Sequence, residues 1–132
     1  LFNCCALVWS SKTLKTVACS SQDAEYMALS DGSREVAFIR NLLSSLGFNV
    51  EEPTPIFGDN NGSLALANNP CDHQKSKHIQ VRYHFVRNMV ADRRVAIGRV
   101  DTHRQLADIL TKALREEQHV LLCKWIFGLM GC

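Results

Sequence analysis

A long amphipathic helix constrains this sequence more than any other feature. Between residues 21 and 46, apolar residues recur at intervals of three, four and seven, which predicts one buried stripe: Leu29, Val36, Ile39, Leu43 and Leu46. The polar side chains among them are expected in solvent: Arg34, Glu35, Arg40 and Asn41. Ser20 and Ser21 supply a hydroxyl cap ahead of Asp23 and Glu25, and Gly47 suits a left-handed residue after the last turn. Any fold of this chain must therefore bury one face of a helix of about seven turns.

The remaining segments alternate between strand patterns and helix patterns. Two short runs rich in Val, Thr, Cys and Trp, at 4–9 and 13–19, predict a hairpin around a polar turn. Further strands are expected at 56–58 and 95–100, and helices at 61–68, 79–90 and 104–115. The order β-β-α-β-α-α-β-α, followed by an apolar tail, indicates an α/β layer fold with helices packed on a mixed sheet.

Length and composition limit the chain to one domain with a real core. The 132 residues are 46% apolar and 21% charged, which excludes a disordered chain and a two-domain enzyme. The longest apolar run, at 120–130, is interrupted by Lys124 and falls short of the ~20 residues that cross a bilayer, so no membrane span is expected. The first nine residues carry no basic leader, and no signal peptide is expected. A net charge of +2 does not by itself indicate nucleic-acid binding.

Six cysteines, at positions 4, 5, 19, 71, 123 and 132, could form three disulfides. Cys4 and Cys5 are adjacent, however, and no Cys-x-x-Cys pair occurs. Reduced, mostly buried thiols in an intracellular protein are therefore expected. A zinc site would draw on Cys71, His73, His78 and His84. On a helix, residues 78 and 84 point about 240° apart, which disfavours this site.

Three acidic residues stand where an α/β fold gathers side chains: Glu25 early in the long helix, Asp59 at a strand end, and Asp108 on the late helix. Carboxylates from separate elements are the usual ligands of paired Mg²⁺ ions. The alternative is that Glu25 and Asp108 lie on solvated helix surfaces and that Asp59 caps the next helix. From spacing alone, this second interpretation is the commoner one.

Four sequence strings resemble, in the same order, the ribonuclease H domain of copia-type retrotransposon Pol polyproteins: WSSKTLKTVACSSQDAEYMAL (9–29), FGDNNGSLALANNP (57–70), KHIQVRYHFVR (77–87) and QLADILTKAL (105–114). Four motifs in the correct order are far more specific than one short pattern. The resemblance covers residues 1 to about 115. It implies an α/β, ribonuclease H-like mixed sheet flanked by helices.

For the three acids, the resemblance implies metal ligation. Glu25 in DAEYMAL, Asp59 in GDN and Asp108 in LAD match the family's helix, strand-end and late-helix carboxylates. In the family, such residues hold two Mg²⁺ or Mn²⁺ ions, and a metal-activated water attacks the RNA phosphodiester of an RNA–DNA hybrid. The 2′-hydroxyl groups then distinguish RNA from DNA.

One departure from the family pattern concerns a fourth carboxylate. The family carries it on a first, central strand that would precede residue 1, and residues 1–22 contain no Asp or Glu. Fewer oxygen ligands weaken divalent-cation binding, so little or no autonomous nuclease activity is expected. Without that strand, the sheet would have edges whose backbone groups are unpaired. A strand from another polypeptide or from upstream sequence is expected to pair with them. A catalytically silent structural subunit of a larger assembly is the alternative function.

Basic residues cluster around the second long helix and are candidates for contacts with a phosphate backbone: Lys75, Lys77, Arg82, Arg87, Arg93 and Arg94. They could equally be ordinary solvated charges, since acids nearly balance them. His103 could shuttle protons near the site, but a surface loop is the commoner place for such a histidine. The family's Pro-Thr-Glu pattern is replaced here by Asp101-Thr102-His103, so no role transfers to His103.

The tail at 116–132 lies outside the ribonuclease H-like part at 1–115. Its apolar residues are too many for a bare surface: Val120, Leu121, Leu122, Trp125, Ile126, Phe127, Leu129 and Met130. We expect a short helix that either closes over the domain's own core or docks on a partner.

Overall fold

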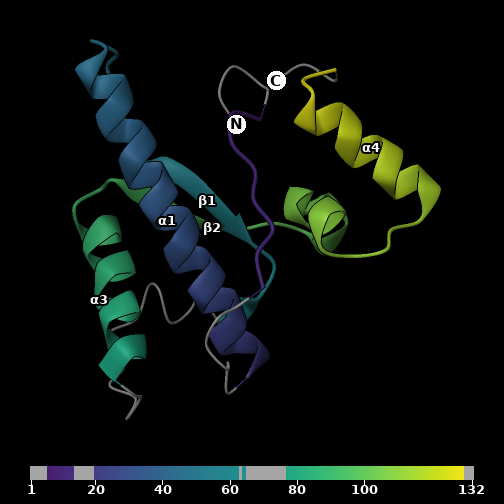
Figure 1. The fold of residues 1–132 in the computed structure, drawn as a ribbon, viewed down its shortest axis with the longest axis horizontal. Coiled ribbons are helices and arrows are strands. Elements are labelled where there is room, and N and C mark those ends of the chain that lie inside the picture. Colours follow the sequence, from purple (N-terminus) through teal and green to yellow (C-terminus); the bar gives the residue numbers. More distant parts are fainter. Residues whose placement is uncertain (1–5, 14–19, 63, 65–76, 130–132) are drawn as a thin grey trace. The chain divides into compact units, whose positions relative to one another are not determined.

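The computed structural model describes residues 6–13, 20–62, 64 and 77–129, with the backbone alone at 77–80. Its secondary structure is mixed α/β (Figure 1). The chain divides into two compact units: a central unit, Thr16–Arg99, and a terminal unit that combines Leu1–Lys15 with Val100–Cys132. None of the described helices is long and apolar enough to cross a membrane.

Helix α1 (Ser21–Ser45) confirms the predicted long helix at both ends. The Ser20 hydroxyl accepts a hydrogen bond from the Asp23 backbone N–H at 3.1 Å, which satisfies one of the free donors of the first turn. At the other end Gly47 has a φ of 85°, and the N–H of Phe48 donates back to the Leu43 carbonyl at 3.0 Å. Glycine reaches this left-handed conformation without the steric cost that a Cβ brings.

Strands β1 (Thr54–Gly58) and β2 (Val95–Arg99) form a two-stranded parallel sheet, which confirms the strands predicted at 56–58 and 95–100. Helix α3 (Lys77–Ala91) lies between them in sequence and confirms the predicted second long helix. Ile56 and Ile97 are paired in register and pack against the core formed by α1 and α3, so both helices cover the same face of the sheet (Figure 1).

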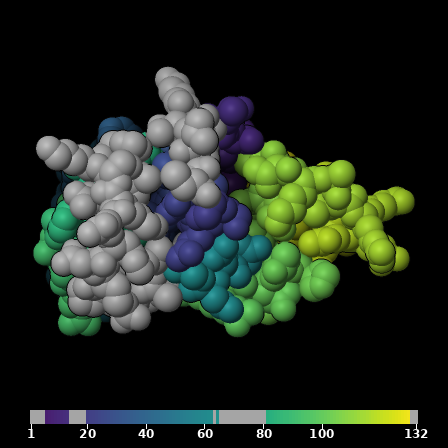
Figure 2. All heavy atoms as spheres, turned by 90° about the horizontal axis from the view of Figure 1, so that it is seen from below, coloured from purple at the N-terminus to yellow at the C-terminus, as the bar shows by residue number. Residues whose placement is uncertain are grey.

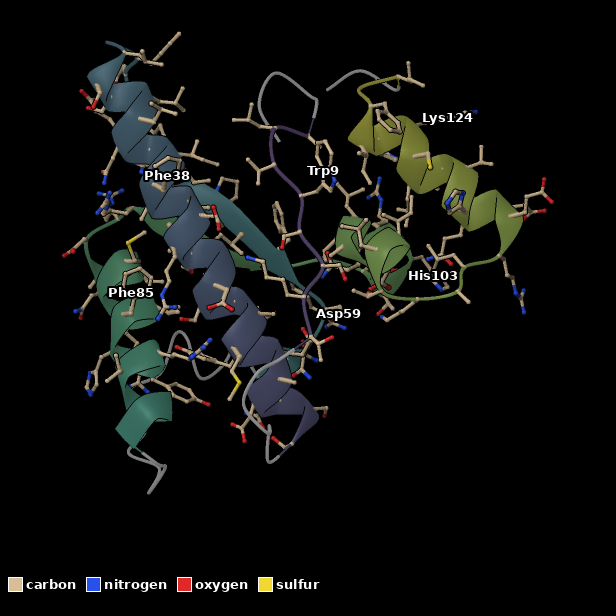
Figure 3. The ribbon with its side chains drawn as sticks, in the orientation of Figure 1. Trp9, Phe38, Asp59, Phe85, His103 and Lys124 are labelled. Atoms are coloured by element: carbon tan, nitrogen blue, oxygen red, sulfur yellow. The ribbon has the colours of Figure 1, made fainter. Side chains whose placement is uncertain are left out.

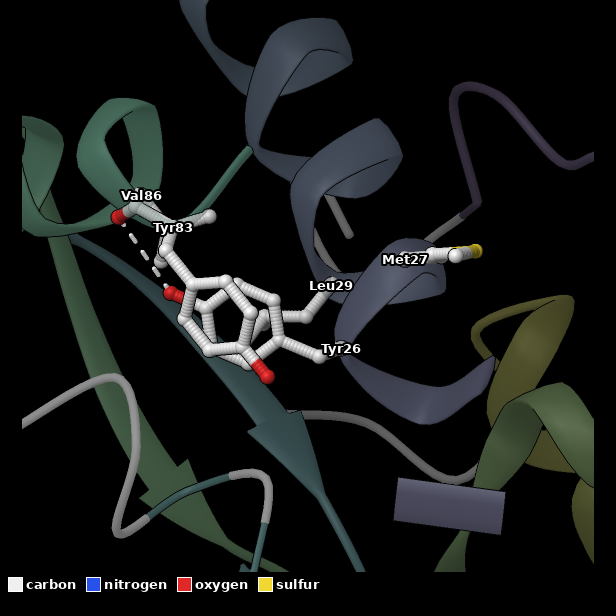
Figure 4. Packing of buried hydrophobic residues seen from close by; sticks show 5 residues of the cluster. All are labelled: Tyr26, Met27, Leu29, Tyr83 and Val86. Carbon is white, nitrogen blue, oxygen red and sulfur yellow. Dashed lines mark hydrogen bonds between the residues drawn. The ribbon is translucent and has the colours of Figure 1, made fainter. Parts of the chain in front are cut away.

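The core of the central unit is built around two tyrosines. The rings of Tyr26 and Tyr83 stack with centroids 3.9 Å apart and an interplanar angle of 22°. The Tyr26 hydroxyl donates a hydrogen bond to the Tyr83 carbonyl at 3.4 Å (Figure 4). Met27, Leu29 and Val86 complete the buried cluster. Burial raises the pKa of Tyr26 above its ordinary value, because the interior disfavours the phenolate.

The buried stripe of α1 differs from the predicted one. Leu29 is buried, but Leu46 is 64% exposed. Three predicted positions between them are half-buried: Val36, Ile39 and Leu43. The fully buried positions include Ser30 and Ser33, which an apolar pattern does not detect. The predicted stripe is wrong toward its C-terminal end because α3, at about 22 Å, is shorter than α1, at about 37 Å.

Arg40 was expected in solvent and instead binds the segment that leads into β1. Its guanidinium donates to the Glu52 carbonyl at 2.7 Å, to the Thr54 hydroxyl at 2.9 Å and to the Val50 carbonyl. The long arginine side chain reaches the loop that follows Gly47, so a polar residue on the helix surface stabilises the strand entrance.

The terminal unit contains short 3₁₀ turns in place of the helix predicted at 104–115. Turns η1 (Thr102–Arg104) and η2 (Leu106–Leu110) are separated by Gln105, whose backbone is extended, so one continuous α-helix cannot form. Helix α4 (Glu116–Ile126) follows and matches the short helix expected in the tail. The backbone N–H of Ala6 donates to the Ile126 carbonyl at 2.9 Å, which joins the two sequence segments of this unit.

Several predicted elements fall partly outside the described residues. Of the hairpin predicted at 4–9 and 13–19, residues 6–13 are described and contain no strand. Strand-forming residue types do not make a strand unless neighbours pair with them, so this part of the prediction is wrong. Residues 61, 62 and 64 of the helix predicted at 61–68 are helical. The rest of both elements lies outside the described residues.

Candidate metal centre

Glu25 lies in the second turn of α1, on the solvent side of the helix. The residue two positions earlier, Asp23, is 6% exposed and accepts a hydrogen bond at 3.4 Å from the Tyr83 hydroxyl. The two acids of this turn therefore differ in surroundings: Asp23 is buried against the core, and Glu25 is exposed.

Asp59 is half-buried and directly follows β1. The loop after it returns to the start of α1, since a Cβ at Gly62 would lie 2.9 Å from the Gln22 side chain. In Figure 2 the teal segment around position 60 lies beside the dark blue start of α1. In Figure 3 Asp59 is labelled at the end of β1 that leads into this segment. Gln22 is one helical turn before Glu25, so the loop that carries Asp59 contacts the part of α1 that carries Glu25.

Asp108 belongs to the terminal unit, in η2, and is 5% exposed. Its Oδ2 accepts a hydrogen bond from the Lys112 ammonium at 2.9 Å. Asp108 is thus buried, but it lies in a 3₁₀ turn and not in the predicted helix. Its carboxylate already has a cationic partner, Lys112.

The three predicted ligands are divided between the two units. Glu25 and Asp59 share the central unit and are linked through the contact of Gln22 with Gly62. Asp108 lies in the terminal unit. No group of three or more His, Cys, Asp or Glu side chains within the described ranges is arranged to hold a metal ion. The chemistry of the donors, which are all carboxylate oxygens, fits Mg²⁺ or Mn²⁺.

The sequence missed the part played by Asp23. This residue shares a helix face with Tyr26, Ser30 and Ser33, all of them buried. These four residues are spaced by three and four positions, as a buried helix face requires, but they are polar or aromatic. The prediction counted only aliphatic residues. A search for helical spacing that includes Asp, Ser and Tyr would have found this stripe.

The basic candidates are partly committed to contacts within the central unit. Arg82 donates to the Asp31 carboxylate at 3.0 Å and to the Met27 carbonyl at 3.4 Å. The Arg87 guanidinium lies 5.9 Å from the centre of the Tyr83 ring, within cation–π range. Lys75 and the Lys77 side chain lie outside the described residues, so their role as phosphate contacts stays a prediction.

The zinc cluster weighed from the sequence lies mostly outside the described residues, since Cys71, His73 and the His78 side chain are not described. His84 is exposed on α3. His103 is exposed in η1, where its backbone N–H donates to the Asp101 carboxylate at 2.8 Å. Neither histidine contributes to a metal site among the described residues.

Comparison with curated proteins finds similarity to retrovirus-related Pol polyproteins of copia-type transposons. The chain is 44% identical to those of transposons RE1 and RE2 from Arabidopsis thaliana, each over 106 residues, or 80% of this chain and 7% of the relative. It is 34% identical to that of transposon TNT 1-94 from Nicotiana tabacum over 124 residues, or 94% of this chain and 9% of the relative. The chain therefore spans less than a tenth of the length of these relatives and is homologous to one segment of them.

No protein-family model matches the chain, and no solved structure matches it significantly. The comparisons support a fragment derived from a retroelement Pol polyprotein.

Proposed function

We propose that this chain is a ribonuclease H-like domain of a retrotransposon Pol polyprotein, which acts on the RNA strand of RNA–DNA hybrids and is weakly active by itself. The observation that carries the proposal is the contact between the loop after Asp59 and the α1 turn that precedes Glu25. Two of the three carboxylates that match the ribonuclease H motifs lie on segments that touch, although Asp59 follows Glu25 by 34 positions in the sequence.

The surroundings of these two acids suit cation binding. Glu25 is exposed near the N-terminus of α1, and Asp59 is half-buried at the end of β1. A bound Mg²⁺ or Mn²⁺ would supply Lewis-acid polarisation of a phosphodiester. Asp108 is the proposed third ligand from the terminal unit.

The proposal of weak activity concerns the fourth carboxylate of the family pattern. Residues 1–22 contain no Asp or Glu, and we propose that this carboxylate comes from a polypeptide segment other than residues 1–22. We further propose that the same partner segment supplies the strand expected beside the sheet, and that Lys75, Lys77, Arg82 and Arg87 contact the hybrid backbone.

A cleavage assay tests the proposal. The full chain is incubated with an RNA–DNA hybrid and Mn²⁺, and the labelled RNA and DNA strands are followed separately. We expect slow cleavage of the RNA strand and none of the DNA strand of the hybrid. The cleavage rate should fall about a hundredfold or more in Asp59→Asn and in Glu25→Gln. Glu35→Gln, an exposed acid farther along α1, is the matched control and should leave the rate unchanged. Equal rates in Asp59→Asn and in the unchanged chain would contradict the proposal.

A catalytically silent structural subunit is the second candidate, and one observation favours it. The Asp108 carboxylate already pairs with Lys112 at 2.9 Å, an arrangement that is stable without a divalent ion. This candidate predicts no RNA cleavage at any Mn²⁺ concentration and no Mn²⁺ binding that depends on Asp59.

A further inference from the structure

We infer that one face of α4 is a contact surface for a second copy of this chain, with the two helices packed antiparallel about a two-fold axis. Four residues form this face, which we call the α4 outer face: Glu117, Val120, Leu121 and Lys124. Counted from Glu117, the others follow at three, four and seven positions. This spacing places all four within a sector of about 100° of the helix circumference.

The opposite side of α4 is already occupied within the terminal unit. Leu122 is 1% exposed, Trp125 and Ile126 are half-buried, and the helix packs on η2. The Ile126 carbonyl also accepts the hydrogen bond from the Ala6 backbone N–H. Because Leu122 lies about 140° around the helix from Glu117, the outer face points away from these contacts.

The α4 outer face is exposed along its length. Val120 and Leu121 are 44% and 41% exposed, and the charged side chains of Glu117 and Lys124 on either side of them are exposed as well. In Figure 3 the labelled Lys124 lies on the side of α4 away from η2. An apolar pair between charged neighbours is the composition of a small contact surface, with an apolar centre and a polar rim.

The order of charges along this face is complementary to itself. Glu117 precedes the apolar pair by one turn, and Lys124 follows it by one turn. The two charges are about 10 Å apart along the axis, so they cannot pair with one another within one helix. Neither side chain has an ion-pair partner among the residues that the structure describes.

A two-fold axis between Val120 and Leu121 would satisfy both charges. In the antiparallel pair, each Glu117 lies opposite the partner's Lys124. Each Val120 then lies opposite the partner's Leu121, and every contact occurs twice, as in any isologous interface. A parallel pair would instead place Glu117 beside Glu117 and Lys124 beside Lys124, which is repulsive. The charge order therefore favours the antiparallel dimer. Since the face is small and exposed ion pairs are weak, the dimer should form only at high protein concentration.

Sedimentation equilibrium of the full chain, under reducing conditions and over a wide concentration range, tests the inference. The unchanged chain should pass from monomer to dimer as its concentration rises. Lys124→Glu makes the face acidic at both ends, and Glu117→Lys makes it basic at both ends. Each should weaken dimerisation about tenfold or more, because two ion pairs become two repulsive pairs. Glu116→Lys makes the same charge change outside the outer face and should leave dimerisation close to that of the unchanged chain.

A mixture of Lys124→Glu and Glu117→Lys gives the sharpest result. Each variant alone should stay monomeric, whereas the mixture should form a heterodimer in which an acidic face meets a basic one. Such recovery also shows that both variants are folded. If these charges acted only on the ends of their own helix, mixing would restore nothing, because that effect is confined to one molecule.

Three results would overturn the inference, and none of them depends on nuclease activity or on the proposed function. The first is an unchanged chain that stays monomeric at every concentration, which includes the case of a face that serves a different protein. The second is a dimer that both charge variants leave intact, which would place the contact elsewhere on the chain. The third is a mixture that stays monomeric.

Discussion

The two halves of α1 are stabilised in different ways. In the first half, residues 21–33, Tyr26 and Met27 are 1% and 2% exposed and form the core with α3 and the sheet. In the second half, residues 34–45, Phe38 and Leu42 are 65% and 48% exposed. There the helix is held by Arg40, which binds the following loop, and by the hydrogen-bonded turn at Gly47.

This difference shows what a helical pattern can and cannot indicate. The spacing identifies residues that share a face, but burial depends on how far the neighbouring elements extend along the helix. Because α1 is about 15 Å longer than α3, its second half extends past the helix that packs on its first half. Apolar residues on that end are exposed although they continue the pattern.

The largest effect is expected in the first half. Tyr26→Ala removes a fully buried ring that stacks on Tyr83, and we expect the free energy of unfolding to fall by about 3–5 kcal/mol. Urea unfolding followed by circular dichroism measures this loss. A loss under about 1 kcal/mol would show that the stacked tyrosines are not the centre of the core.

In the second half, Arg40→Ala removes three hydrogen bonds to the segment before β1. We expect a loss of about 2 kcal/mol, because a charged donor serves the partly buried Val50 carbonyl and Thr54 hydroxyl there. Arg34→Ala is the comparison, since Arg34 is exposed, pairs with Asp31 on its own helix and lies 5.8 Å from the centre of the Phe85 ring, and it should cost less than about 1 kcal/mol. Equal losses for the two variants would contradict a special role of Arg40.

Alkaline pH should weaken the first half in particular. The pKa of Tyr26 is raised above its ordinary value of 10.0 mainly by burial, so the unfolded chain releases this proton at a lower pH than the native chain. The contribution is fully present below pH 10 and is lost as the pH rises further, so Tyr26 should stabilise the native chain less at pH 11 than at pH 8. Denaturant unfolding of the unchanged chain and of Tyr26→Phe at pH 8 and pH 11 isolates this contribution. Identical pH dependence in both proteins would contradict it.

The end of α1 should tolerate a Cβ poorly for conformational reasons alone. Gly47 has a φ of 85°, and a Cβ there would meet no atom within 4 Å. We therefore expect Gly47→Ala to cost about 1 kcal/mol through backbone strain, measured by thermal unfolding. Gly32→Ala, within the same helix and with equal space around the Cβ, should stabilise the protein instead. If Gly47→Ala and Gly32→Ala changed the stability equally, the left-handed conformation of Gly47 would carry no cost for alanine.

The smallest effect is expected on the exposed face of the second half. Phe38→Ser should change the free energy of unfolding by no more than about 0.5 kcal/mol, since the ring is 65% exposed. A loss comparable to that of Tyr26→Ala would mean that the two halves of α1 are packed alike.

Much of the central unit follows from local sequence. The limits of α1 were predictable because Ser20 and Gly47 are residues whose chemistry suits helix ends. The strand predicted at 56–58 was placed two residues short, since β1 begins at Thr54 and includes Pro55. The motifs also identified Glu25 and Asp59, but no local pattern predicts that Gly62, in the loop after Asp59, lies close to Gln22 of α1.

Other features depend on tertiary contacts that a local pattern does not encode. The burial of Asp23 depends on Tyr83, 60 positions later. The segment at 104–115 has helical apolar spacing, but the extended backbone of Gln105 splits it into 3₁₀ turns. The partner of Asp108, Lys112, lies four residues away and was not predicted, because the two interpretations of Asp108 were a metal ligand and a solvated surface residue, neither of them a buried ion pair.

The most direct test of a shared cation site is paramagnetic broadening of backbone amide signals by Mn²⁺ in an NMR titration of this 14.8 kDa chain. We predict that the signals of residues 22–25 and 59–62 broaden together at the same Mn²⁺ concentrations, and that both sets stay sharp in Asp59→Asn. Broadening of one segment without the other, or broadening that persists unchanged in Asp59→Asn, would contradict a metal ion held jointly by Glu25 and Asp59.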